Sequence, residues 1–360
     1  MAAGQPVKTA FTMALATLLL VGCSSIAFVQ QSWQGQREVM ALSVPIQELL
    51  KSPDTDRQLK KRLAEAQAAR EFASSALGLP DNASYTRYSA LPRPYALWNL
   101  FVAQELSLEP VQHCYLFTGC LAYKGYFALE AAQTAAAKWR EQGMEVFIGD
   151  IPAYSTLGWY DDPLLSSMLH WDDDYLAMTL FHELAHQQFY VKDDTAFNES
   201  FATFVGREGL RQWRANRGLP PPNRDLEQQE AEFTNLMMAT RERLQAVYAS
   251  DLPDTAKRKA KQAEFARLRR DYANWRDARP AQRQRFDGWF AGELNNASLL
   301  PFGLYDQWLP AFAELFQRSG ADWQRFYREV QRLGSLSTNE RQAALAALAL
   351  AQAINGEQHP

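Results

Sequence analysis

The spacing of apolar residues predicts a protein built mainly of helices. Apolar side chains recur every three or four positions, the period of a helix with one buried face, around 36–51 and 54–77 and again over 224–248 and 254–279. Leu252-Pro253-Asp254 supplies a turn between the last two stretches, so we expect them to form an antiparallel hairpin. The remaining predicted helices near the carboxyl end cover 281–295, 308–319, 321–332 and 338–354.

A small sheet is predicted in the first half of the chain, where aromatic and aliphatic residues alternate with polar ones. The expected strands are Trp98–Ala103, Val111–Phe117 and Glu145–Ile151, with Ala153–Trp159 as a candidate extension of the last. An alanine-rich helix is expected over Phe127–Glu141, because Gly143 stops the helical pattern. The fold class that follows is α+β, mainly helical, with a small sheet and an appended helical hairpin.

The first 23 residues differ from the rest of the chain and predict export. The apolar run Ala10–Val21 is too short to span a bilayer comfortably, which favours a cleaved signal peptide. Gly22 before Cys23 resembles the lipobox of bacterial lipoproteins, in which the cysteine is acylated and the signal is cut before it. An ordinary signal peptide is the alternative. Ser24, rather than aspartate, at the next position indicates the outer membrane of a Gram-negative bacterium.

These features divide the chain into an export segment and one folded domain. We expect a signal peptide over 1–22, a membrane anchor through Cys23 and a short glutamine-rich tether over 23–35. The folded part is then a single domain over 36–360, with the hairpin as an insertion at about 224–280. The protein would act from the periplasmic face of the outer membrane.

Composition and charge are those of an ordinary folded protein. Of the 360 residues, 47% are apolar and 22% are charged, which suits one large core. The net charge of −4 argues against a nucleic-acid partner. Lysine and arginine gather between about 207 and 285, but acidic residues are interleaved with them, as on a solvated helical face.

Cys114 and Cys120 are separated by five residues, and export places them in an oxidising compartment. A disulfide that closes this short loop is therefore expected, because the third cysteine, Cys23, is assigned to lipid. The alternative is a zinc site that combines both cysteines with His113, for which no fourth ligand is evident nearby.

The run His182-Glu183-Leu184-Ala185-His186 carries the strongest chemical signal in the chain. On a helix expected from Asp172 to about Tyr190, His182 and His186 lie one turn apart on the same face, so both imidazoles can reach one ion. Glu183 can address a water on that ion and act as general base. The motif predicts one zinc ion per chain. The alternative is a buried pair of structural histidines with an incidental glutamate.

A catalytic zinc needs a third protein ligand, and the acidic residues that follow the motif are the candidates. Glu199 lies one turn into a second predicted helix over 196–214, for which Thr195 is a candidate cap, and a short loop could bring this glutamate across to the ion. Asp193 and Asp194 are rivals for the same position. If Glu199 is the ligand, we expect Asp194 and Asn198 to orient the ligands or to cap the helix.

Several of these segments together resemble a known family. Asn198-Glu199-Ser200-Phe201-Ala202 is similar to the Asn-Glu-Gly-Phe-Ala element of the gluzincin aminopeptidases, and the wider pattern resembles a family of bacterial lipoproteins described as predicted zinc aminopeptidases. The segments that carry the resemblance are Gly119–Phe127, Ala153–Trp159, His182–His186, Phe197–Gly206 and Asn295–Ala297 with Tyr305. It implies a zincin-like core, Glu199 as third ligand and a disulfide. The Gly-x-Met-Glu-Asn element, which grips the substrate amine in gluzincins, is absent.

Zincins present a β-strand edge to an extended peptide shortly before the metal helix, and Ala153–Trp159 occupies that place here. The expected edge residues are Tyr154, Ser155, Thr156, Leu157 and Gly158. The alternative is a core strand that ends in a glycine turn. Asn295 and Asn296 are candidates either for orienting ligands or substrate, or for capping a helix.

A hydroxyl group is also needed to stabilise the oxyanion of the reaction. Tyr305 and Tyr154 are the leading candidates, with Tyr123 and Tyr126 behind them. Packing in the core is the alternative role for each tyrosine.

The sequence as a whole predicts an exported zinc metallopeptidase that acts on a peptide substrate. A non-catalytic lipoprotein scaffold, stabilised by zinc and using the hairpin as a partner surface, is one alternative. A zinc amidase acting on cell-wall peptides is another. The motifs predict how a peptide bond would be cut and leave open which bond that is.

Overall fold

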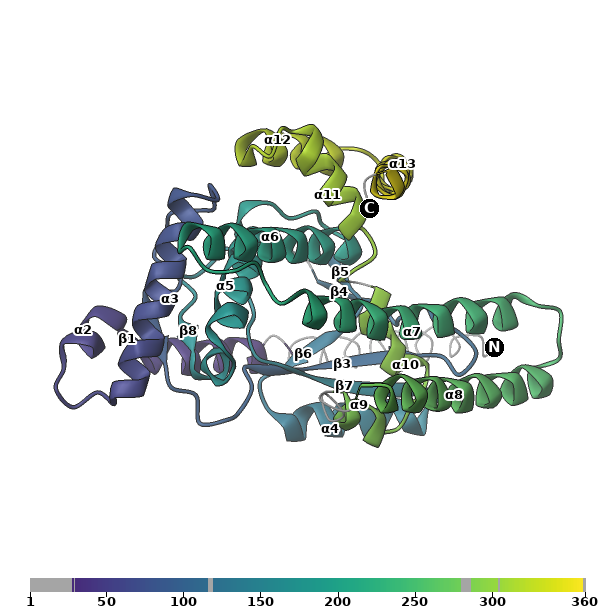
Figure 1. Ribbon diagram of the computed structural model, residues 1–360. Coiled ribbons are helices and arrows are strands. Elements are labelled where there is room, and N and C mark those ends of the chain that lie inside the picture. The colour runs from purple at the N-terminus through teal and green to yellow at the C-terminus, as the bar shows by residue number, and fades with distance from the viewer. Residues whose placement is uncertain (1–27, 29, 116–118, 280–285, 304, 359–360) are drawn as a thin grey trace, which may run out of the picture.

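The computed structural model describes residues 28, 30–115, 119–279, 286–303 and 305–358 (Figure 1). The expected signal peptide over 1–22 and the expected lipidation site, Cys23, lie outside the described residues. Residues 30–41 form a helix, so the segment that we expected to act as a tether is helical from residue 30. Within the described ranges, none of the helices combines the length and the apolar character that crossing a membrane requires.

Three helices form the centre of the main hydrophobic core. They are α3 (Arg57–Ser75), α5 (Asp173–Gln188) and α6 (Thr195–Asn216). The ring of Phe72 on α3 lies 6.1 Å from that of Phe181 on α5 and 5.1 Å from that of Trp213 on α6. Asp172 caps α5 by accepting a hydrogen bond from the Tyr175 amide at 2.8 Å, which confirms the predicted start of this helix.

A three-stranded antiparallel sheet packs beside these helices, with strand order β6-β3-β7. Its strands are β6 (Lys124–Tyr126), β3 (Leu97–Ala103) and β7 (Glu145–Ile151), and helices α4 (Leu129–Glu141) and α10 (Asn296–Leu299) lie on it. Leu100 faces the α4 cluster and Phe101 the α10 cluster, so β3 is buried on both faces. The predictions of β3, β7 and α4 are confirmed within two residues at each end.

Short strands account for most of the differences from the predicted elements. The helix predicted over 36–51 is interrupted by β1 (Ser43–Pro45), after which α2 (Ile46–Lys51) begins. The β1 strand pairs with β2 (Arg87–Ser89), which pairs in parallel with β8 (Leu164–Leu165). Segments of two or three residues are too short to show the alternation of a strand, and their pairing partners lie far away in the sequence.

The strand predicted over Val111–Phe117 is shorter than expected. It is β4 (His113–Tyr115), which pairs with β5 (Gly119–Leu121), and residues 116–118 lie outside the described part of the chain. The predicted extension of β7 over Ala153–Trp159 is wrong, since this segment is a loop.

The carboxyl-terminal half is helical, as predicted, and the appended hairpin is present (Figure 1). Its helices are α7 (Arg224–Ala249) and α8 (Asp254–Asp277), followed by α9 (Asp287–Ala291), α11 (Leu309–Arg318), α12 (Trp323–Gly334) and α13 (Thr338–Gln358). The hairpin and α9 have a separate core in which the rings of Tyr272 and Phe290 stack 3.8 Å apart. The helix predicted over 281–295 is shorter than expected, because only Asp287–Ala291 is helical among the described residues 286–295. The observed class is α+β, mainly helical with small sheets.

Phe312 on α11 provides a test of how α11 to α13 are fixed to the rest of the protein. Its fully buried ring lies 5.3 Å from Phe197 and 5.8 Å from Phe201, both on α6, and 6.4 Å from Phe326 on α12. We predict that Phe312→Ala lowers the free energy of unfolding by about 3–5 kcal/mol in urea titrations. Leu350→Ala, at a position that is 64% exposed, should change it by less than about 0.5 kcal/mol. Equal effects would contradict this packing.

Candidate metal centre

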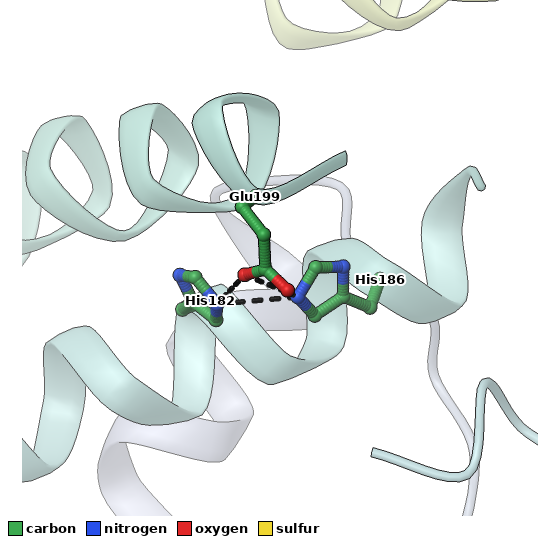
Figure 2. Close-up of side chains that lie close together, drawn as sticks. All are labelled: His182, His186 and Glu199. Atoms are coloured by element: carbon green, nitrogen blue, oxygen red, sulfur yellow. Dashed lines mark hydrogen bonds and ion pairs between the residues drawn. The ribbon is translucent and has the colours of Figure 1, made fainter. Parts of the chain in front are cut away.

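Two neighbouring helices bring three metal-ligating side chains together. His182 and His186 project from one face of α5, and Glu199 reaches them from the first turns of α6 (Figure 2). The Nε2 atoms of the two histidines are 3.2 Å apart. Glu199 Oε2 lies 3.4 Å from His182 Nε2 and 3.5 Å from His186 Nε2. Among the described residues, His182, His186 and Glu199 form a group that could hold a metal ion, which we call the metal group. Neither Asp193 nor Asp194 belongs to it.

The close approach of α6 to α5 depends on small residues. Ala202, Gly206 and Gly209 follow Glu199 at spacings of three and four, so they lie on the same face of α6. A Cβ atom on Gly206 would lie 3.0 Å from the carbonyl oxygen of Met178 and 3.4 Å from the Cβ of His182. Larger side chains on this face would push α6 away from α5 and carry the Glu199 carboxylate out of reach of the imidazoles.

The loop between the two helices is held by side chains that we expected near the ligands. Asn198 accepts a hydrogen bond from the Val191 amide at 2.8 Å and donates one to the Val191 carbonyl at 2.7 Å. Asp194, not Thr195, caps α6, by accepting from the Phe197 amide at 3.0 Å. Both residues therefore fix the start of α6 and with it the position of the next turn.

Asp193, which we considered as a rival metal ligand, instead binds the backbone of β5. Its carboxylate accepts a hydrogen bond from the Cys120 amide at 2.6 Å, and its φ of 66° is unusual for a non-glycine residue. The predicted disulfide between Cys114 and Cys120 is present and links β4 to β5. Because both sulfurs are used in that bond, the alternative zinc site with His113 is excluded in this structure.

Burial and the two imidazoles act on the carboxylates in opposite directions. Burial alone would raise the pKa of Glu199, but His186 and His182 outweigh it and lower the pKa to about 2. Burial raises the pKa of Glu183, and the same two imidazoles only partly offset that rise. Burial would lower the pKa of His186, yet the Glu199 carboxylate raises it above its ordinary value. The site thus combines the Glu199 carboxylate, whose pKa is lowered, with the buried Glu183 carboxylate, whose pKa is raised.

The three side chains open onto a cleft of about 580 Å³, which Glu183 also lines. Apart from the motif itself, its walls are mostly aromatic and aliphatic, and they include Tyr123, Tyr154, Tyr305 and Trp159. A cavity of about 680 Å³ between α11, α12 and α13 contains none of the metal-group residues. The smaller cleft is therefore where chemistry at the metal group would take place.

The expected substrate edge lines this cleft as a loop and not as a strand. Leu157 and Gly158 have φ angles of 57° and 80°, which turn the chain back on itself. The buried side chain of Asp162 accepts hydrogen bonds from the amide and the hydroxyl of Thr156, both at 2.8 Å, and lies 3.5 Å from the hydroxyl of Ser155. Asp162 was missed because the segment 153–159 was predicted as a strand, although Gly158 and the run Asp161-Asp162-Pro163 are residues typical of turns.

The candidate tyrosines differ in their surroundings. Tyr305 stacks beside His182 with ring centres 6.3 Å apart, and burial raises its pKa well above the ordinary value. The Tyr154 hydroxyl donates to the Gln36 side chain at 2.5 Å, so it is already engaged. Tyr123 lines the cleft, whereas Tyr126 packs its ring against Phe28. Tyr305 is thus the predicted tyrosine whose ring stacks beside a histidine of the metal group.

Tyr190 is a further cleft residue that the sequence analysis missed. It lies four positions after His186, and burial, followed by the charge of Glu199, raises its pKa to about 12. Because α5 ends at Gln188 and Phe189 is extended, Tyr190 reaches the cleft from the loop, and no helical spacing could have identified it.

Asn295 and Asn296 have structural roles, and the helix cap that we considered for them is present at Asn295. Asn295 caps α10 with a reciprocal pair of hydrogen bonds to Ser298, and its amide reaches the Val146 carbonyl at 3.2 Å. Asn296 is fully buried and accepts from the Tyr248 hydroxyl at 2.8 Å. The pair ties α10 to β7 and to α7.

The loop that lines the cleft should depend on Asp162. We predict that Asp162→Ala makes limited proteolysis within residues 153–161 at least about tenfold faster, because removing the acceptor leaves the Thr156 donors unpaired at a cost of roughly 1–3 kcal/mol. Asp161→Ala, one position away at an exposed residue, is the matched control and should leave the rate unchanged. Equal rates for the two variants would remove this role from Asp162.

The start of α6 should depend on a buried ion pair between Arg341 on α13 and Asp194. Arg341 Nε donates to Asp194 Oδ2 at 2.8 Å, and the two side chains are 5% and 12% exposed. We predict that Arg341→Met lowers the free energy of unfolding by about 3–5 kcal/mol, because it leaves a buried carboxylate without its partner. Arg332→Met breaks the exposed pair with Glu329 and should cost less than about 1 kcal/mol in the same urea titration.

Comparison with known protein families gives a match that covers most of the chain. A profile of the family described as "Putative aminopeptidase" matches residues 27–345. No curated protein and no solved structure matches the chain. The match covers every element that builds the metal centre and its cleft. The chain therefore belongs to the "Putative aminopeptidase" family, a family of peptidases.

Proposed function

We propose that the protein is a zinc-dependent metallopeptidase with a zincin-like core, in which one zinc ion per chain is held by His182, His186 and Glu199. The observation that carries this proposal is the convergence of these three donors, of which His186 and Glu199 are buried, in a cleft that Glu183 also lines. Membership of a peptidase family supports the reaction class. An amidase acting on cell-wall peptides has no separate support in the site.

The spacing of the donor atoms fits a zinc ion. A tetrahedral ion about 2.1 Å from each donor separates the donors by about 3.4 Å. The three distances in this group are 3.2, 3.4 and 3.5 Å. Two imidazoles with one carboxylate are a donor set that suits zinc, and three protein ligands leave one position for water or substrate, as in catalytic sites.

The residues around the group provide the remaining parts of a hydrolysis reaction. A zinc ion held here would lower the pKa of a bound water and polarise the substrate carbonyl. The Glu183 carboxylate, one residue after His182, would accept the proton of the attacking water and pass it to the departing amine. The Tyr305 hydroxyl, beside His182, would donate a hydrogen bond to the carbonyl oxygen as it gains negative charge.

The cleft supports a peptide substrate with apolar side chains. Aromatic residues form much of its wall, and two of them, Trp33 and Trp159, are 53% and 65% exposed. Such rings bind apolar side chains by excluding water from both surfaces. The lipid anchor on Cys23 and the location at the outer membrane stay predictions, because the residues concerned lie outside the described part of the chain.

Exchanging the proposed base for its amide tests the function directly. We predict that the purified protein carries one zinc per chain and cleaves peptides of a mixed library, and that a chelator abolishes cleavage until zinc is restored. Glu183→Gln should keep the zinc while kcat falls by about 10²–10⁴-fold, because the amide cannot accept a proton. Glu199→Ala should lose the zinc as well. Metal analysis and product mapping by mass spectrometry measure both properties.

Glu71→Gln, the same exchange at an exposed position of α3, is the matched control and should leave zinc content and kcat unchanged. Full activity in Glu183→Gln would contradict the proposed mechanism. Stoichiometric zinc with no cleavage of any peptide would favour the zinc-stabilised scaffold.

A further inference from the structure

The β6 strand is an edge of its sheet, and one side chain covers part of that edge. On the side away from β3, the Gly125 carbonyl and the Phe127 amide point outward, as alternate residues of an edge strand do. The carboxamide of Gln31 binds both groups: its Nε2 donates to the Gly125 carbonyl at 3.2 Å and its Oε1 accepts from the Phe127 amide at 3.3 Å. Gln31 thus takes the hydrogen bonds that an added strand would make there.

The helix that carries Gln31, residues 30–41, is packed firmly against this edge. Gly35 lies so close to the Phe127 ring that a Cβ atom there would be 2.1 Å from the ring carbon Cγ. Farther along the helix, Glu38 pairs with Arg93 at 2.9 Å, and the Val39 carbonyl accepts from the Ser89 hydroxyl at 2.8 Å. The position of Gln31 is therefore fixed by contacts along the whole helix.

The same helix forms one wall of the cleft that holds the metal group. Ser32, Trp33 and Gln36 line the cleft together with His182 and Glu199. Gln36 is buried, and its Nε2 has no hydrogen-bond partner among the described residues. A buried amide of this kind gains a hydrogen bond when a substrate main-chain group is placed beside it.

The other end of this edge reaches the part of the cleft that holds the metal group. Tyr123, which directly precedes β6, lines the cleft together with Tyr305, and the Tyr305 ring stacks beside His182. From Tyr123 to Gly125 the chain advances two residues, about 7 Å at about 3.3 Å per residue. A peptide extended along this edge advances at the same rate. It therefore has room for about two residues between the metal group and Gln31.

The wall of the cleft also limits how the end of a peptide could be recognised. Among the described lining residues, the only carboxylates are Glu183 and Glu199, which the metal chemistry uses, and no lysine or arginine is present. Asn99, on β3 opposite Gly125, also lines the cleft; it is buried, and its Oδ1 has no partner in the described part of the chain. Apart from the metal group and Glu183, the cleft thus offers neutral amides, and not charges, to a substrate.

We propose that a peptide substrate extends along the β6 edge, that helix 30–41 is a stop at the end of this edge, and that Gln31 limits the enzyme to substrates with about one or two residues before the scissile bond. The inference rests on the peptidase function proposed above. Because the family is one of aminopeptidases, the chain end that meets the stop is the amino terminus. The substrates are then peptides with apolar amino-terminal residues, whose first residues lie between Gln31 and the metal group.

Cleavage of a peptide series by the full-length protein tests the stop. The peptides share one cleavable bond and carry one, two, three or five residues on its amino side. For the unmodified protein, kcat/KM should fall at least about tenfold between two and three residues. Gln31→Ala should raise the ratio of kcat/KM for long peptides to that for short ones about tenfold, since the freed edge groups can then bind the longer chain.

Gln34→Ala is the matched control, because Gln34 is an exposed glutamine one turn farther along the same helix. It should leave the length dependence unchanged. Zinc-dependent cleavage that is equally fast for all lengths would overturn the stop while leaving the metallopeptidase function intact. An unchanged length dependence in Gln31→Ala would overturn it too.

Amide exchange supplies a measurement that does not depend on activity. The Phe127 amide should exchange its proton slowly in the unmodified protein and at least about tenfold faster in Gln31→Ala, because its acceptor is removed. Gln34→Ala should leave the rate unchanged. Equal exchange in the unmodified protein and in Gln31→Ala would show that Gln31 does not cover the edge, and the proposal would fail whatever the peptidase activity.

Discussion

The candidate site depends on one constraint: α6 must lie close enough to α5 for the Glu199 carboxylate to meet two imidazoles in a buried position. Small residues on the facing side of α6 allow that approach, and Gly206 has no room for a Cβ atom without close contact to Met178. The charge of Glu199 is tolerated there because His182 and His186 compensate for its burial. Helix 30–41, the sheet and the loop after β7 supply the other walls of the cleft.

The parts of the molecule that could be predicted are those with a local signal. Helices such as α5 and the α7–α8 hairpin follow from period and caps, and the motif from His182 to His186 follows from its spacing. The third metal-group member, Glu199, could be placed because a short loop limits where the next helix can start. The disulfide followed from the expected compartment and from the short spacing of Cys114 and Cys120.

The remaining features depend on contacts between distant segments. The loop after β7 was predicted as a strand because its apolar and polar residues follow the pattern of an extended segment. The buried Asp162 instead holds it as a loop by accepting hydrogen bonds from Thr156. Gln31 showed no pattern at all, since its partners are backbone groups some 94 and 96 positions away. A segment expected to act only as a tether therefore forms a wall of the cleft, which links the amino end of the chain to the proposed choice of substrate.

Anomalous X-ray diffraction at the zinc absorption edge, on crystals of the purified protein, tests the metal centre most directly. One peak per chain is predicted, within about 2.0–2.2 Å of His182 Nε2, His186 Nε2 and a Glu199 carboxylate oxygen, with no fourth protein ligand. A peak at another place, no peak in a protein saturated with zinc, or a fourth protein ligand that closes the site would contradict a catalytic zinc centre.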